Sequence, residues 1–384
     1  MSAGTNVSIH LNTIAALRKV SLCLGAFFFA SPLCAMDQGL VSQHIQLAQD
    51  DLGSGKWERS LARFRWLLLE SDPDPQHMVA YQNTIASITA EHPLRFGVSG
   101  AILPSSNIAK ASNHSVFSTE FGDFYIDSSE DRKSGIGLQL GVSATYSVPY
   151  ARGRSVFVTG ASSASHFKQK DLQVAQAGIS IGHEWLSAGR QFRVTLSHNA
   201  FAYREIEGRD DPDFASDALS FDSYHRINPN FSVRGQIALQ DANYAERDYN
   251  DGLHKSISIT PKIDLNTQNA LSIKIGLQDV DIDAKHLSFS GKSIGLFWDR
   301  TEQNGIRWGL GIEQHWREFD SRFPALSYNR ADHVTDLVLS VSHPRIKIKD
   351  MTPRLRCTLR DHGSNVALYD YKSTDCSVSL NYQF

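Results

Sequence analysis

The chain ends in Val378-Ser379-Leu380-Asn381-Tyr382-Gln383-Phe384, with an apolar residue at every second position back from a terminal phenylalanine. Successive side chains of a β-strand point to opposite faces, so this stretch predicts a strand with one apolar and one polar face. Such an ending is typical of an outer-membrane β-barrel, whose last strand closes the wall and is recognised by the barrel-insertion machinery. An ordinary amphipathic strand would look the same, and the rest of the chain decides between the two.

The same period of two extends back through residues 94–384, in about fourteen strand-like runs. Each run is long enough to cross a bilayer at a tilt. The sequence therefore predicts a mainly β protein, a fourteen-stranded antiparallel transmembrane barrel. The predicted runs are 94–103, 135–148, 155–167, 172–186, 190–204, 215–227, 231–245, 254–264, 269–283, 287–301, 305–319, 332–344, 352–364 and 373–384.

The connections between the runs alternate in length. Tight turn sequences such as Ser187-Ala188-Gly189 and Asn228-Pro229-Asn230 follow the even-numbered runs, whereas several links after odd-numbered runs, such as 104–134 and 320–331, are long and polar. A soluble β-sandwich accounts for the strand period but not for this alternation. Short turns on the periplasmic side and long loops on the other are typical of an outer-membrane barrel.

The parity of each run assigns side chains to the lipid or to the lumen. Leu271, Ile273, Trp308 and Leu380 are expected to face lipid. A charge that faces lipid near the midplane costs a few kcal/mol, so charged side chains are expected inside. We favour charges that line a wet lumen and pair with one another over a specific substrate site. The lumen candidates are Arg193, Arg234, Lys274, Arg307, Glu313, Asp336, Arg354 and Arg356.

The segment before the barrel has a different period. Residues 36–93 carry apolar positions at helical spacing, first at Trp57, Leu61, Phe64 and Leu68 and then from Met78 to Ile88, with a proline-rich break between them. Two or three short helices bury little core alone, so we expect this segment to pack against something larger.

Residues 1–35 have the order of a secretory signal: Arg18 and Lys19, an apolar run to Ala30, then small residues up to Ala35. Its removal would shift the net charge from −3 to about −5, because it carries two basic and no acidic residues. No basic surface predicts nucleic acid as a partner.

Two cysteines, Cys357 and Cys376, remain after the signal segment. They share the lipid-facing parity on two neighbouring runs, and a loop centred near residue 367 or 368 would place them almost opposite each other. An oxidising compartment would allow a disulfide between them. The alternative is two small apolar residues in the wall.

No pattern predicts catalysis, a metal or a cofactor. Gly291-Lys292-Ser293 lacks the earlier glycine of a phosphate loop, and His183-Glu184 lacks the second histidine of a zinc protease helix. The acidic runs Asp279-Asp281-Asp283 and Asp210-Asp211-Asp213 lack the spacing of a calcium loop.

Several short motifs follow one another over 94–384: Ser106, Asn107 and Ile108 after the first run, Arg330 and Asp332 before the twelfth, Ser364, Asn365 and Tyr371 in the last loop, and Phe384 at the end. In their order and spacing, these motifs resemble those of the surface lipoprotein assembly modulator (Slam) family. The resemblance implies a periplasmic tetratricopeptide-type domain before the barrel, of which 36–93 would be a shortened remnant.

The resemblance also implies a role in moving client proteins, surface lipoproteins or secreted haem- and iron-acquisition proteins, across the outer membrane. It implies no catalytic residues. Two other classes remain open at this point: a passive porin or solute channel, whose long loops would fold inward, and an outer-membrane enzyme.

Overall fold

The computed structural model describes residues 38–126, 134–168, 172–204, 212–348 and 351–384. The expected signal segment, 1–35, lies outside the described residues, as do Asp210 and Asp211 of one acidic run. Everything below concerns the described residues.

In the part of the chain that the structure describes, three helices precede the barrel: α2 (Gln38–Gly53), α3 (Trp57–Glu70) and α4 (Pro75–Glu91). Asp74 caps the N-terminus of α4: its carboxylate accepts hydrogen bonds from the backbone N–H groups of Gln76 and His77, and Pro75 occupies the first turn. None of the helices in the described part of the chain is long and apolar enough to cross a membrane.

The helical segment has a small apolar core, as the spacing of its apolar residues predicts. Leu61, Phe64, Leu67 and Leu68 of α3 are buried against α2 and α4. Leu186, near the end of a barrel strand, is buried in the same core. The three helices therefore lean on the barrel, as expected for a segment too short to bury a core alone.

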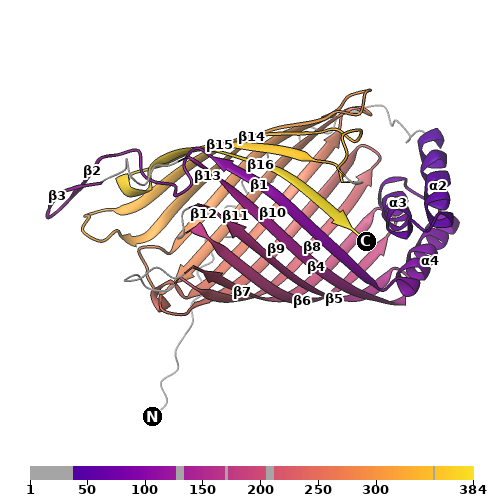
Figure 1. Ribbon diagram of the computed structural model, residues 1–384, viewed down its shortest axis with the longest axis horizontal. Coiled ribbons are helices and arrows are strands. Elements are labelled where there is room, and N and C mark those ends of the chain that lie inside the picture. Colours follow the sequence, from indigo (N-terminus) through magenta and orange to yellow (C-terminus); the bar gives the residue numbers. More distant parts are fainter. Residues whose placement is uncertain (1–37, 127–133, 169–171, 205–211, 349–350) are drawn as a thin grey trace, which may run out of the picture. The chain divides into compact units, whose positions relative to one another are not determined.

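Fourteen antiparallel strands form one closed barrel, which confirms the predicted architecture. Figure 1 shows the helices gathered at one end and the loops at the other. Each observed strand lies within a few residues of its predicted run. The strands are β1 (Leu94–Ser105), β4 (Gly135–Ala151), β5 (Arg154–His166), β6 (Val174–Ser187), β7 (Arg190–Tyr203), β8 (Phe214–Asn228), β9 (Phe231–Tyr244), β10 (Gly252–Asp264), β11 (Asn269–Ile282), β12 (Phe289–Thr301), β13 (Arg307–Arg322), β14 (Asn329–Ser342), β15 (Arg354–Ser364) and β16 (Tyr371–Gln383).

One extra hairpin lies in the long loop after β1. Strands β2 (Val116–Thr119) and β3 (Gly122–Tyr125) pair with each other and with no barrel strand. The hairpin extends beyond the loop end of the barrel in Figure 1. Sequence reasoning treated this segment as loop.

The barrel closes between its first and last strands, along a seam. Phe96 and Phe384 exchange two backbone hydrogen bonds of 2.7 and 2.9 Å, and their rings stack. The ladder then runs from Gly97–Gln383 to Ile102–Val378 and resumes only at Ser105–Asp375. Leu103 and Pro104 lie outside it, since a proline has no N–H to donate. The seam therefore has seven register pairs, whereas β1 and β4 share twelve.

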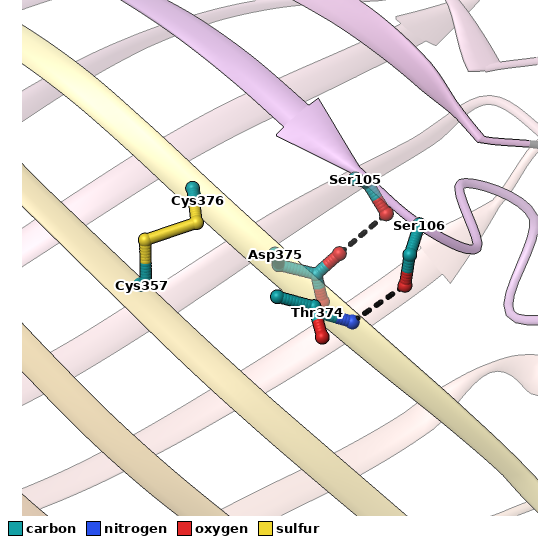
Figure 2. Close-up of a disulfide and its surroundings, with 6 residues drawn as sticks. All are labelled: Ser105, Ser106, Cys357, Thr374, Asp375 and Cys376. Atoms are coloured by element: carbon teal, nitrogen blue, oxygen red, sulfur yellow. Dashed lines mark hydrogen bonds between the residues drawn. A yellow bond between two sulfur atoms is a disulfide. The ribbon is translucent and has the colours of Figure 1, made fainter.

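A disulfide joins Cys357 of β15 to Cys376 of β16, directly opposed residues in the register. Figure 2 shows the bond lying across the two strands, with Ser105 of β1 donating to Asp375 on the far side of β16. The last two strands are thus covalently tied to each other, whereas the seam is held by backbone and side-chain hydrogen bonds.

Replacing both cysteines by alanine should destabilise the barrel. The bond spans a sequence separation of 19, and in the chain-entropy model a loop of this size contributes about 3 kcal/mol. Urea unfolding of the refolded protein in detergent should show a lower midpoint for the double variant. The reduced wild-type protein is the control and should match it, and equal midpoints for oxidised wild type and variant would contradict the expectation.

Candidate functional site

A buried carboxylate at the helical end joins the helices to the barrel. Glu184 of β6, with a side chain 7% exposed, accepts two hydrogen bonds from Arg65 of α3, at 2.7 and 2.8 Å. Gln191 and Arg193 of β7 donate two more, at 2.7 and 2.8 Å. The Oε1 atom of Glu184 accepts three of these four hydrogen bonds and Oε2 accepts one. Burial alone would lower the pKa of Arg65, but the hydrogen bonds and charge of Glu184 outweigh it and leave that pKa raised.

Further contacts fasten the helices to the neighbouring turns. Glu70 at the end of α3 accepts hydrogen bonds from Tyr224 (2.7 Å) and Arg226 (3.1 Å) of β8. Gln82 of α4 donates to the Leu186 carbonyl. Gly153, with φ of +64°, lies where an added Cβ would be 2.2 Å from that carbonyl oxygen and 2.6 Å from Gln82. Only glycine tolerates both the conformation and the close approach.

Other charged side chains on the inner face pair across the wall. Lys274 of β11 and Glu313 of β13 lie 2.9 Å apart across β12, where Gly295 is the register partner of both and has no side chain to separate them. Asp336 of β14 accepts two hydrogen bonds from Arg360 of β15, at 2.6 and 2.8 Å. Pairing of this kind neutralises charges that would otherwise be costly to bury.

The remaining lumen candidates have different surroundings. Arg234 lies with its guanidinium 5.3 Å from the centre of the Tyr224 ring. Arg307 and Arg354 are exposed at the turn end of their strands, and Arg356 is exposed further along β15. Of the four residues expected to face lipid, Ile273 and Trp308 are exposed, as are many apolar side chains of the same parity, and Leu271 and Leu380 are half-buried.

The loop end of the barrel holds a second concentration of polar side chains, in residues 105–126, 319–332 and 362–375, here called the loop cluster. Its apolar centre consists of Phe323, Leu326 and Val366, with Phe117 packed against them. Segments far apart in the sequence therefore meet in one place: the first loop, the β13–β14 loop and the last hairpin.

Arg330 and Asp332 form the most buried ion pair of the loop cluster. Arg330 donates two hydrogen bonds to Asp332, at 2.9 and 2.6 Å, and the side chains are 7% and 0% exposed. His362 contacts the same carboxylate at 3.1 Å. The Arg330 guanidinium also lies 3.2 Å from the centre of the Tyr369 ring, a cation–π contact. The sequence predicts this motif before the strand, but β14 begins at Asn329 and includes it, because the strand extends past the alternating run.

Two asparagines fix the backbone of the loop cluster. Asn107, fully buried, donates to the carbonyls of Ala111 and Lys372 and accepts from the Ala111 N–H. Asn365 accepts from the Ala331 N–H and donates to the Asn329 carbonyl. Each side chain therefore bridges two segments of the chain.

The other motif residues lie close by. Ser106 accepts a hydrogen bond from the Thr374 N–H at 2.7 Å (Figure 2). Ser364 accepts from the Val366 N–H, and buried Tyr371 packs on His362. Ile108 is half-buried beside them. The motifs that sequence analysis singled out are thus structural parts of the loop cluster, with the exception of Phe384 at the seam.

The acidic run in β11 makes ordinary ion pairs. Asp279 pairs with Lys255 at 3.0 Å, and Asp281 pairs with Lys285. Within the described ranges, no group of three or more His, Cys, Asp or Glu side chains could hold a metal ion.

Solved structures with a similar fold are outer-membrane proteins. OpdQ of Pseudomonas aeruginosa is 7% identical, with 76% of this chain and 98% of OpdQ covered and a TM-score of 0.39. OmpF of Salmonella typhi, solved with daunomycin, is 8% identical, with 76% and 97% covered and a TM-score of 0.41. OprD of Pseudomonas aeruginosa is 9% identical, with 76% and 92% covered and a TM-score of 0.38. Likenesses this distant carry no functional information.

A family match is more informative. The sequence model of the surface lipoprotein assembly modifiers matches residues 95–384, which is the whole barrel without the helices. No curated protein matches the chain significantly. The family and the barrel fold are not enzymatic types. The resemblance inferred from short motifs is confirmed: the chain belongs to the surface lipoprotein assembly modifier family and is a protein of the bacterial outer membrane.

Proposed function

We propose that this protein delivers lipoprotein clients from the periplasm to the cell surface. Membership of the family supports surface lipoprotein assembly. The observation that carries the finer proposal is the helical segment fastened to one end of the barrel by Arg65 and Glu184. Passive diffusion needs no such element, whereas a protein client needs a surface that receives it.

In this proposal the short-turn end, with its helices, is periplasmic, and the loop cluster is at the cell surface. Outer-membrane barrels have short periplasmic turns and long outer loops, which supports this orientation. The helices would then receive the client at the mouth of the barrel, although they are fewer than in a full repeat domain.

The client's acyl anchor would leave through the seam between β1 and β16. Each buried CH₂ of an acyl chain is worth about 0.8 kcal/mol in lipid, so a route through a wet lumen is unfavourable for the anchor. The seam has an interrupted ladder at Leu103 and Pro104, and the neighbouring pair β15–β16 is tied by the disulfide. Opening at the seam would therefore leave the last two strands together.

Cells that export an epitope-tagged surface lipoprotein, with and without this chain, test the proposal. The epitope should become accessible to antibody and protease on intact cells only when the chain is present. Uptake of small hydrophilic solutes is the parallel measurement and should not change. Increased solute uptake with the client still inside would instead favour the alternative, a passive porin or solute channel.

A further inference from the structure

A cavity of about 300 Å³ lies between the helices and strands β1 and β4–β7, and its lining is basic. Arg65, Arg95, Arg154 and Arg193 line it, and Glu184 is the only acidic residue among its lining side chains. Arg154 is exposed and shares the outward parity of Val156 and Val158, so the side chains that face the cavity carry a net charge of +2. Side-chain hydroxyls of β4 and β5 supply further hydrogen-bond donors.

Glu184 cannot neutralise the remaining arginines. Its carboxylate already accepts four hydrogen bonds, all from Arg65, Gln191 and Arg193. Arg95 has one hydrogen bond to Ser147, and its Nε is buried with no partner among the described residues. The Nε of Arg193 is in the same situation. Glu58 of α3 interacts electrostatically with Arg95 but does not line the cavity.

Buried guanidinium donors without acceptors are costly, and an oxyanion would satisfy them. Arg95 and Arg193, which belong to the barrel, have the lumen-facing parity, so a lipid headgroup on the outer wall cannot reach them. We propose that this cavity, here called the arginine chamber, binds the carboxylates of an acidic polypeptide segment. The segment would belong to the client as it enters the lumen. The client assignment rests on the proposed function, but the binding of acidic peptide does not.

Binding of a fluorescent oligoglutamate peptide to the full chain in detergent tests the inference, with an oligoglutamine of equal length as the neutral control. Oligoglutamate alone should bind, and added salt should weaken it. Arg95→Gln and Arg193→Gln, each of which removes a guanidinium that faces the cavity, should each weaken binding about tenfold, or about 1.4 kcal/mol. Arg300→Gln is the matched control, because Arg300 pairs with Glu302 away from the cavity, and it should bind like wild type.

Inorganic phosphate in a parallel titration separates the two sources of an oxyanion. Phosphate binding that is lost in Arg95→Gln, without oligoglutamate binding, would overturn the peptide assignment and leave a small-anion site. Equal affinity for oligoglutamate and oligoglutamine, or wild-type affinity in both cavity variants, would overturn the chamber itself. Peptide binding by a chain that delivers no client would count against the proposed function only.

Discussion

Locking β1 to β16 with an engineered disulfide should abolish surface delivery of the client while leaving the barrel folded. Ala101 and Ser379 are register partners on the inner face. Because Phe96 and Phe384 exchange backbone hydrogen bonds, alternation along the ladder makes Ala101–Ser379 a non-hydrogen-bonded pair. The Cβ atoms of such pairs lie close enough for a disulfide. Ala101→Cys with Ser379→Cys should therefore cross-link the seam and prevent its opening.

A matched cross-link between two other strands distinguishes loss of seam opening from a general stiffening of the barrel. Ser220 and Ala238 are register partners on β8 and β9, and both are small and inward-facing. The Ala245 N–H donates to the Asp213 carbonyl, so alternation along this ladder makes Ser220–Ala238 a non-hydrogen-bonded pair. Ser220→Cys with Ala238→Cys should form its disulfide and still deliver the client. Adding reductant should restore delivery to the seam variant. Undiminished delivery by a fully cross-linked seam would exclude this exit route.

The barrel was predictable from sequence because its rule is local. Alternation at Leu271, Ile273 and Ile275 requires only that one face meets an apolar environment, and tight turns mark where each strand ends. The β2–β3 hairpin follows no such rule, because its Phe117 packs on the apolar centre of the loop cluster and not on the barrel wall. Its four-residue strands are also too short to show a clear apolar–polar alternation.

The contacts between distant segments were not predictable in the same way. Glu184 drew attention only as half of an incomplete metalloprotease motif, and nothing near it in the sequence points to Arg65, which is 119 residues away. A glutamate at a lumen-facing position of β6 was the one available signal. Asn107 and Asn365 were found through family motifs, but their backbone-bridging role depends on how three loops meet.

Reversing the charge of Glu184 should release the helical segment from the barrel and strongly reduce client delivery. In Glu184→Arg, a new guanidinium would lie beside Arg65 and Arg193, both now without their acceptor. Loss of one partner of a buried ion pair costs roughly 3–5 kcal/mol, and the side chains here are 25% and 7% exposed. The measurements are surface-exposed client and hydrogen exchange of α3, which should rise.

The reciprocal variant and a matched control test whether the loss of docking comes from the Arg65–Glu184 contact. Arg65→Glu alone should also release the helices, whereas Arg65→Glu with Glu184→Arg should recover part of the docking, because contacting residues couple by about 0.5–3 kcal/mol. Arg63→Glu is the control, since Arg63 pairs with Asp51 inside the helical segment. It should leave the helices docked on the barrel.

Deletion of residues 38–91 gives the lowest client delivery expected of these variants. If the helices receive the client, the deletion and Glu184→Arg should lower delivery to a similar level, while heat-modifiable migration on gels shows that both barrels are inserted and folded. The double variant Arg65→Glu with Glu184→Arg should then deliver more client than the deletion variant, because it restores an ion pair of the same chemistry in the same place. Wild-type delivery by the deletion variant would show that recruitment does not use the helices, and the Arg65–Glu184 contact would be only a structural attachment.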